Sequence, residues 1–130
     1  MGTVTLTGDT FASTVSSNEI VLVDFWAAWC GPCRMFAPVF EASSEAHPGV
    51  VFAKVDTEAE QELAASFAIM SIPTLLAFRD GILLYAQPGA LPASALEDLI
   101  RQIDELDMDE VRRRVSEADA AAPARAGASR

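Results

Sequence analysis

Runs of apolar residues, separated by short polar and glycine-containing segments, divide this chain into alternating strands and helices. Continuous apolar runs bounded by turn residues predict strands, whereas apolar residues repeated every three or four positions predict amphipathic helices. On this basis the sequence predicts strands at residues 4–6, 20–26, 50–56, 74–79 and 82–87. It predicts helices at residues 10–15, from the segment after Cys30 to about 46, at 58–67 and at 92–105.

The order of these elements favours an α/β fold with a mixed sheet between layers of helices. Residues 20–26 are apolar apart from Asp24, which is typical of a central strand covered on both faces. Residues 50–56 have the same character. Asp80-Gly81 separates the last two strands and is a strong signal for a tight hairpin. A strand-helix alternation that ends in a hairpin requires both parallel and antiparallel pairing.

The C-terminal part of the chain predicts a helix, a shorter helix and then a tail. Pro92 suits the first position of the helix at 92–105. A further short helix is expected to dock through Leu106, Val111 and Val115. From Ala118 onward the composition of Ala, Arg, Pro and Gly offers little to bury, which favours disorder. We therefore expect one domain at residues 1–108 and a C-terminal extension at 109–130.

Composition and charge describe a soluble globular protein that avoids polyanions. With 130 residues, of which 51% are hydrophobic, one domain of this size buries roughly 65% of the surface of its unfolded chain. Residues 1–108 carry four basic and fifteen acidic side chains, a net charge of −11, and residues 109–130 carry five and four. So acidic a domain repels nucleic acid, which excludes it as a partner.

The termini and the cysteine count indicate a reducing, cytoplasmic location. The first residues lack the basic and apolar regions of a signal peptide, and no apolar run is long enough to span a membrane. Two cysteines cannot form a framework of disulfides. In a reducing compartment, two neighbouring thiols serve redox chemistry or metal binding more often than structure.

Those two cysteines lie three residues apart in Trp29-Cys30-Gly31-Pro32-Cys33-Arg34, directly after the predicted central strand. At this spacing, in the first turn of a helix, the two thiols share one face and can form a disulfide. A structural zinc site needs four ligands, whereas the chain has two cysteines and one histidine, so zinc would require a site shared by two copies. A purely structural disulfide is also disfavoured, because so short a loop removes little entropy from the unfolded chain.

The redox interpretation assigns a role to each residue of this motif. Cys30 at the helix N-terminus meets unpaired amides and the helix dipole, which favour its thiolate. This thiolate attacks a substrate disulfide, and Cys33 then displaces the product from the mixed disulfide. Gly31 and Pro32 add neither a cation nor a hydrogen-bond donor beside the sulfur, so the thiolate is only moderately stabilised. The pair is therefore expected to act as a reductant of other disulfides.

At this point the sequence closely resembles the thioredoxin family. The resemblance extends over residues 4–106 and rests on the segment 25–35, on Ala37-Pro38, Ala53-Lys54-Val55-Asp56 and Ile72-Pro73-Thr74, and on Pro88-Gly89-Ala90. It implies a thioredoxin fold, with a central mixed five-stranded sheet flanked by helices and a cis-proline, Pro73, before the fourth strand. Residues 1–108 would then be a bacterial-like thioredoxin domain.

The same resemblance implies roles for two charged residues in the central strands. Asp24 is the single charge in a strand that is otherwise apolar, and a buried carboxylate has a perturbed pKa unless it is paired. Its counterpart in thioredoxins lies beneath the cysteines and transfers a proton to or from the resolving thiol. Lys54 is expected to pair with Asp24 across the sheet and tune its titration. The alternatives are an aspartate that reaches solvent and a lysine that extends out of a strand edge.

Substrate binding is expected on an apolar rim around Cys30. A cis bond before Pro73 would direct the Ile72 backbone at an extended peptide, and Gly89 would let the peptide backbone approach closely. For Trp29 and Met70, the alternative to substrate binding is ordinary packing within the fold. The expected rim consists of Trp29, Met70, Ile72, Pro73, Gly89 and Ala90. Ser71 and Pro88 depart from the usual family pattern at this surface.

Together these features predict a monomeric, cytoplasmic protein disulfide reductase and electron carrier that serves cell redox homeostasis and holds no cofactor or metal. The resemblance implies an NADPH-dependent flavoprotein, thioredoxin reductase, as the electron donor. It implies peroxiredoxins, ribonucleotide reductase and methionine sulfoxide reductase as electron acceptors. An oxidant or isomerase of the same fold would be expected to carry a histidine or another hydrogen-bond donor between the cysteines. The alternative from another class is a redox-insensitive binding or regulatory module that uses the apolar rim.

Overall fold

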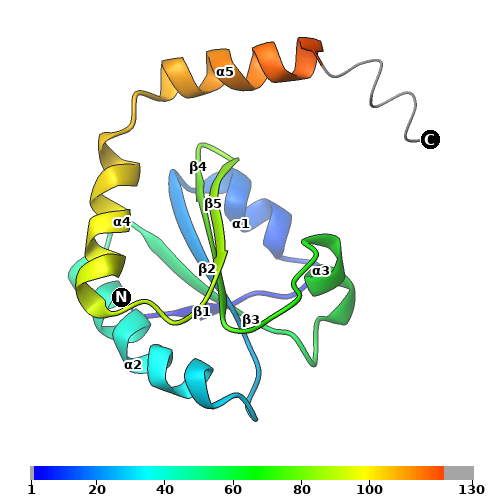
Figure 1. Ribbon diagram of the computed structural model, residues 1–130, viewed down its shortest axis with the longest axis vertical. Coiled ribbons are helices and arrows are strands. Elements are labelled where there is room, and N and C mark those ends of the chain that lie inside the picture. The colour runs from blue at the N-terminus through cyan, green and yellow to red at the C-terminus, as the bar shows by residue number, and fades with distance from the viewer. Residues whose placement is uncertain (1, 122–130) are drawn as a thin grey trace.

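A five-stranded sheet forms the centre of the computed structural model, which describes residues 2–121 (Figure 1). The strand order is β1-β3-β2-β4-β5. The first three strands in this order are parallel, and β4 and β5 run antiparallel to their neighbours, so the predicted mixed sheet is confirmed. The strands are β1 Val4–Thr5, β2 Ile20–Trp26, β3 Val51–Asp56, β4 Thr74–Arg79 and β5 Ile82–Pro88.

Helices cover both faces of this sheet, with α1 and α3 on one side and α2 and α4 on the other (Figure 1). The helix α3 is shorter than the predicted 58–67. A carboxylate oxygen of Asp56 accepts hydrogen bonds from the N–H groups of Glu58 and Ala59, which holds those residues in a turn before the helix begins. The helices are α1 Phe11–Ser17, α2 Gly31–Ala46, α3 Gln61–Ser66, α4 Ala93–Glu105 and α5 Met108–Ala121.

Alternation along β2 decides which side chains reach each helical layer. Val21, Val23 and Phe25 belong to the core beneath α1 and α3. Ile20 and Leu22 belong to the core beneath α2 and α4. Continued along the strand, the same alternation places Asp24 on the α2 face. The one charge of the strand therefore lies beneath the helix that carries Cys33.

The helix α5 differs from the expectation in its anchor and in its length. Leu106 and Val115 are each 39% exposed, so the prediction that they dock the helix is wrong. Met108, only 6% exposed, is the buried anchor, and Arg112 forms an ion pair with Asp80 in the β4–β5 turn.

The helix also extends past Ala118, where we expected it to end, to Ala121. Arg113 pairs with Glu110 and Glu117, and Arg114 pairs with Glu110, at helical spacings that support a solvated helix. The rest of the expected tail, residues 122–130, lies outside the described residues.

Arg79 joins the end of β4 to the end of α4. Its guanidinium donates hydrogen bonds to the backbone carbonyl oxygens of Ile103 at 2.8 Å, Asp104 at 3.1 Å and Leu106 at 3.3 Å. The last carbonyls of a helix lack most of their N–H donors, although that of Ile103 also accepts the N–H of Leu106 at 3.3 Å, and the negative end of the helix dipole favours a cation there. This junction lies at the opposite end of the sheet from the cysteines.

Candidate active site

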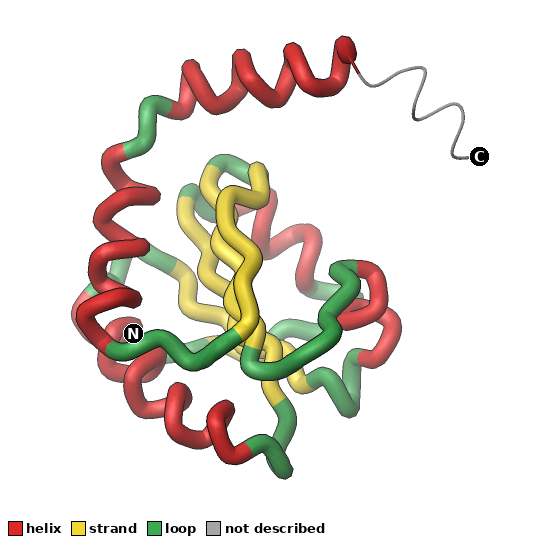
Figure 2. Tube along the Cα trace, viewed as in Figure 1, coloured by secondary structure: helices red, strands yellow, loops and turns green. Residues whose placement is uncertain are grey.

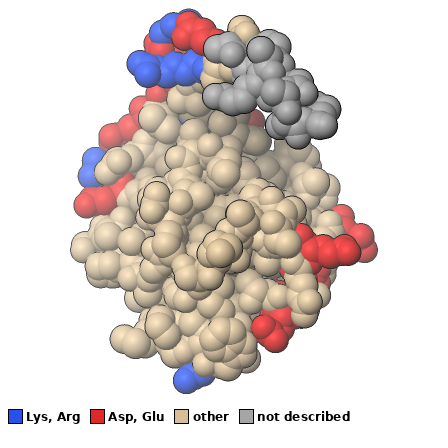
Figure 3. Space-filling view, turned by 45° about the vertical axis from the view of Figure 1, so that its right-hand side comes forward, with Lys and Arg blue, Asp and Glu red and all other residues tan. Residues whose placement is uncertain are grey.

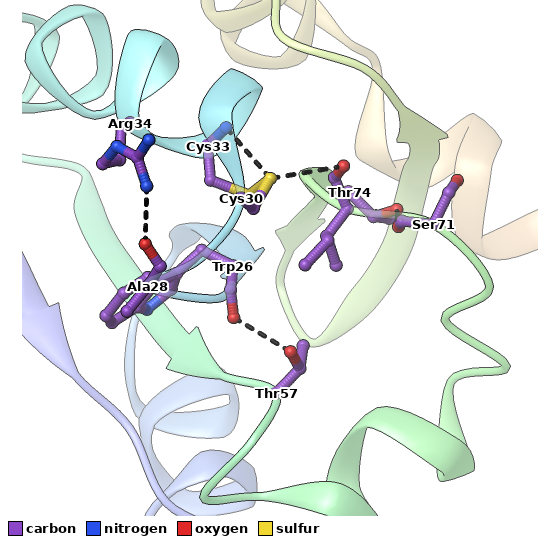
Figure 4. Close-up of a disulfide and its surroundings, with 9 residues drawn as sticks. Trp26, Ala28, Cys30, Cys33, Arg34, Thr57, Ser71 and Thr74 are labelled. Carbon is purple, nitrogen blue, oxygen red and sulfur yellow. Dashed lines mark hydrogen bonds between the residues drawn. A yellow bond between two sulfur atoms is a disulfide. The ribbon is translucent and has the colours of Figure 1, made fainter.

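The end of β2 leads directly to the two cysteines. Cys30 is the N-cap residue of α2, and the backbone N–H of Cys33 donates a hydrogen bond of 3.1 Å to the Cys30 Sγ (Figure 4). The two residues form a disulfide across a Cα–Cα distance of 5.2 Å. A sulfur that already accepts a helix N-terminal N–H is placed where a thiolate is stabilised once the disulfide opens. Among residues 2–121, no three His, Cys, Asp or Glu side chains are grouped to hold a metal ion.

Both sulfurs are nearly buried, but they lie beside an exposed tryptophan. Cys30 and Cys33 are 4% and 3% exposed and pack with Ala27, Trp26 and Ile72. Trp29, in contrast, is 66% exposed. Only a small part of Cys30 and Cys33 reaches solvent, directly next along the chain to an exposed aromatic side chain.

Arg34 supports the loop that carries Trp29. Its guanidinium donates a hydrogen bond of 2.8 Å to the carbonyl oxygen of Ala28, directly before Trp29 (Figure 4). The sequence does not predict this contact. Arg34 belongs to the cysteine motif, but a hydrogen bond from a side chain to a backbone carbonyl six residues earlier has no signal in the sequence.

Asp24 is a buried carboxylate without a hydrogen-bond partner. The residue is 1% exposed, and neither carboxylate oxygen has a partner among the described residues. Burial raises the pKa of Asp24 from 3.8 to about 7, and the positive charge of Lys54 opposes that rise. The expectation of a perturbed carboxyl is confirmed, and the group changes its charge near neutral pH.

Lys54 faces Asp24 across the sheet but does not touch it. The two residues are register partners in the parallel pair of β2 and β3. The Lys54 ammonium lies 4.8 Å from the centre of the Trp26 ring, as a cation–π contact, and no ion pair of Lys54 occurs among the described residues. Lys54 therefore acts on Asp24 through space and not through the direct pairing that we expected.

Three loops meet at the end of the sheet where the cysteines lie: those after β2, before β4 and after β5 (Figure 2). The Ile72–Pro73 bond is cis, as predicted. The Ile72 carbonyl oxygen lies 3.7 Å from the Cys30 Sγ, and the N–H of Gly89 donates a hydrogen bond of 2.8 Å to the Pro73 carbonyl oxygen. Ile72, Pro73 and Gly89 are thus brought to the sulfurs from distant parts of the sequence.

The structure places half of the expected rim in one hollow. A hollow of about 340 Å3 beside the cysteine loop is lined by Trp29, Met70 and Ile72. Pro73 is buried and does not line it, and Gly89 and Ala90 are exposed but do not line it either. The sequence analysis missed the other lining residues, which are Thr57, Ala64, Ile69 and Ser71.

A second hollow of about 260 Å3 continues from the first toward β5, and the two share Ile69, Met70 and Ser71. Figure 3 shows a broad uncharged surface on this side of the molecule, with acidic and basic side chains at its edges. An apolar hollow with a charged border is suited to an apolar stretch of another protein.

A larger cavity lies elsewhere in the described residues. It has a volume of about 680 Å3 and is lined mainly by the end of α2, the segment 47–50 and α4. Within it, the His47 Nε2 and a Glu97 carboxylate oxygen form a hydrogen bond of 2.6 Å, which lowers the pKa of Glu97. No residue of the cysteine loop lines this cavity. Size therefore does not identify the reactive site here, whereas the disulfide does.

Comparison with known proteins gives one consistent result. Residues 2–102 match the family model described as Thioredoxin. The chain is 58% identical over 120 residues to "Putative thioredoxin 2" of Streptomyces coelicolor. The aligned part covers 92% of this chain and 90% of the relative. It is 41% identical over 103 residues to "Thioredoxin" of Bacillus subtilis, and that aligned part covers 78% of this chain and 98% of the relative. Among solved structures, it is similar to a mutant thioredoxin from Halobacterium salinarum, with a TM-score of 0.75, 37% identity and coverage of 81% and 93%.

Proposed function

The chain belongs to the thioredoxin family, and from this premise we propose that it reduces protein disulfides and passes electrons between proteins. It is a thiol–disulfide oxidoreductase that performs dithiol–disulfide exchange through Cys30 and Cys33. The observation that carries the proposal is the position of the disulfide at a helix N-terminus, where the Cys30 Sγ accepts the N–H of Cys33.

Cys30 is the nucleophile of the proposed mechanism. Its thiolate attacks one sulfur of a substrate disulfide, and the other substrate sulfur leaves as a thiolate. The Cys33 thiol then loses its proton and attacks the Cys30 Sγ, which releases the second substrate thiolate. Two electrons pass from the Cys30–Cys33 pair to the substrate, and the pair becomes the disulfide seen in the structure. Gly31 and Pro32 set the redox potential, because neither adds a charge beside the sulfurs.

Asp24 is proposed to accept the proton of Cys33. It lies on the face of the sheet that α2 covers, and its pKa of about 7 lets it take up or release a proton near neutral pH. Lys54 tunes this exchange, because its charge favours the carboxylate. Asp24 is thus proposed as the proton-transfer group and Lys54 as the residue that shifts its titration.

The apolar hollow is proposed to dock the polypeptide that flanks the substrate disulfide. Trp29, Met70 and Ile72 supply apolar contact. Ile72 also presents a backbone carbonyl next to Cys30, where an extended chain can add strand-like hydrogen bonds. Pro73 fixes the course of this loop. Gly89 donates its N–H to the Pro73 carbonyl oxygen, and nothing lies within 4 Å of a Cβ added at Gly89, so Gly89 and Ala90 are proposed to border the substrate beside Pro73.

The partners follow from this chemistry. We propose a flavin-dependent, NADPH-fed thioredoxin reductase as donor, and peroxiredoxins, ribonucleotide reductase and methionine sulfoxide reductase as acceptors. We propose a monomer in a reducing compartment, the cytoplasm, with the chemistry confined to residues 1–108 and the extension at 109–130 apart from it. No helix within residues 2–121 is long and apolar enough to cross a membrane. A redox-insensitive binding module is not favoured, because the two thiols lie at bonding distance and the relatives are thioredoxins.

Reduction of insulin by the full chain, with dithiothreitol as electron source, tests the proposal. The wild type is expected to accelerate the reaction, and Cys30→Ser is expected to abolish the acceleration. Cys33→Ser, reduced and then freed of dithiothreitol before it is mixed with insulin, is expected to accumulate a mixed disulfide through residue 30, because no thiol remains to release it. A Cys30→Ser variant that still accelerates reduction would contradict the proposal.

A further inference from the structure

Met70 combines full exposure with a position inside the proposed docking surface. Its residue surface is 93% exposed, more than that of Trp29 at 66%. It lines both apolar hollows beside the cysteine loop. Met70 therefore presents its thioether to solvent while forming part of the wall against which a substrate would pack.

We propose that Met70 is a site of oxidation by hydrogen peroxide, and that its sulfoxide weakens docking of protein disulfides. One oxygen atom passes from the peroxide to the thioether sulfur. The O–O bond breaks, an S–O bond forms, and water leaves. The sulfur gives up two electrons, which reduce the peroxide. The inference rests on the docking role proposed for the hollow.

The other methionines of the described chain allow the site to be assigned. Met108, the first residue of α5, is 6% exposed, so peroxide reaches it only when the structure opens. Met35 is 75% exposed on α2 but does not line either hollow. Met35 is therefore a matched control, because it is accessible to the same oxidant without contributing to the docking surface.

Oxidation changes the character of the wall without changing the cysteines. The thioether is apolar and adaptable, whereas the sulfoxide is polar and chiral. Covering that oxygen with an apolar substrate segment leaves it without a hydrogen bond. The expected loss in kcat/KM for a protein disulfide is about 3-fold to 30-fold. A small disulfide that contacts only Cys30 does not cover Met70 and is expected to react at an unchanged rate.

The effect would persist through the catalytic cycle. Thiol–disulfide exchange regenerates the Cys30–Cys33 dithiol but does not remove an oxygen atom from a thioether. Recovery requires a methionine sulfoxide reductase, which reduces the sulfoxide with two electrons from a dithiol and releases the oxygen as water. Peroxide exposure would thus lower activity toward proteins in a way that fresh dithiol alone does not reverse.

The test begins with the disulfide form of the full chain, whose cysteines are protected from peroxide. Peptide mass mapping during exposure to hydrogen peroxide is expected to show the added oxygen at Met70 and Met35 well before Met108. Equal rates at Met70 and Met108 would overturn the proposal. The treated protein is then assayed with insulin and, separately, with oxidised glutathione, using dithiothreitol as reductant.

The ratio of treated to untreated rates separates docking from chemistry. For the wild type and for Met35→Leu, this ratio is expected to fall about 3-fold to 30-fold with insulin and to stay near one with oxidised glutathione. For Met70→Leu the ratio is expected to stay near one with both, whatever the basal rate of the variant. Treatment with a methionine sulfoxide reductase should restore the wild-type rate.

Two failures remain distinguishable. An untreated wild type that does not accelerate insulin reduction would contradict the proposed function itself. An untreated wild type that is active, and that keeps its rate after Met70 is converted to the sulfoxide, would overturn only the inference about Met70. Loss of rate in Met70→Leu equal to that of the wild type would overturn it as well.

Discussion

Replacing Asp24 with asparagine should change how the stability of the protein depends on pH. The substitution keeps the size of the side chain but removes its ionisation. Asp24 is buried without a hydrogen-bond partner among the described residues, so the folded state disfavours the carboxylate. The unfolded chain exposes the same group to water and ionises it freely.

The sign follows from the two pKa values of the carboxyl. In the unfolded chain the pKa of Asp24 is close to 3.8, and in the fold it is raised to about 7. Below pH 3.8 both states hold the proton and the group has no effect. Between these values only the folded state holds it, so the free energy of unfolding falls as pH rises. Above about 7 both states are ionised and the loss is complete.

The magnitude is large for a domain of this size. The gap between the two pKa values corresponds to a loss on the order of 4 kcal/mol, at about 1.4 kcal/mol per pH unit. An asparagine amide at this position carries its own cost, because it too is buried without a partner, but that cost does not vary with pH. Between about pH 4 and pH 8, the free energy of unfolding of Asp24→Asn should therefore rise relative to that of the wild type by about 4 kcal/mol.

Urea unfolding of the disulfide form at several pH values measures this shift. Each midpoint and slope gives a free energy of unfolding, and the two proteins are compared at each pH. Asp9→Asn removes an exposed carboxylate and controls for net charge. If the curves of the wild type and Asp24→Asn run parallel across this pH range, the reasoning about the buried carboxyl is refuted.

Three further predictions use other parts of the site and the fold. Lys54→Met should raise the pKa of Asp24 above about 7, because the positive charge that lowers it is removed. Lys54→Arg keeps that charge and should leave the pKa near about 7, and NMR titration of the Asp24 carboxyl measures the pKa in both variants. Arg79→Met should lower the free energy of unfolding by about 1–3 kcal/mol, because the carbonyls at the end of α4 lose the hydrogen bonds of the guanidinium. A denaturation midpoint equal to that of the exposed-pair control Arg101→Met would contradict this. Equilibration with glutathione buffers should leave the Cys30–Cys33 pair oxidised under conditions where glutathione is mostly reduced, and a strongly oxidising midpoint would reverse the proposed direction of electron flow.

The sequence predicts those elements whose hydrophobic pattern is itself the cause of the structure. The runs at 20–26 and 74–79 become β2 and β4 with the same bounds, because central strands must be apolar on both faces. The helix at 58–67 begins late, because the Asp56 side chain competes for backbone N–H groups after β3. That competition depends on a side-chain geometry that hydrophobic periodicity does not encode.

In the candidate site, too, the sequence predicts some features, whereas others become visible only in the fold. The cysteine motif and the lone charge of β2 predict the chemistry, because few other roles suit those residue types at that spacing. The position of the Lys54 ammonium over Trp26 depends on side-chain rotamers, which the strand pattern leaves open. The burial of Met108 depends on how α5 meets the β4–β5 turn, so only the assembled fold reveals it.

The most direct test of the account compares the reactivity of the two cysteines. In the reduced protein, iodoacetamide should alkylate residue 30 at neutral pH much faster than residue 33, because a helix N-terminal N–H points at the Cys30 sulfur and stabilises its thiolate. Peptide mapping of Cys33→Ser and Cys30→Ser, each with one thiol, measures the two rates separately. A ratio well above one in favour of residue 30 is expected, and equal or reversed rates would contradict the claim that exchange begins at Cys30.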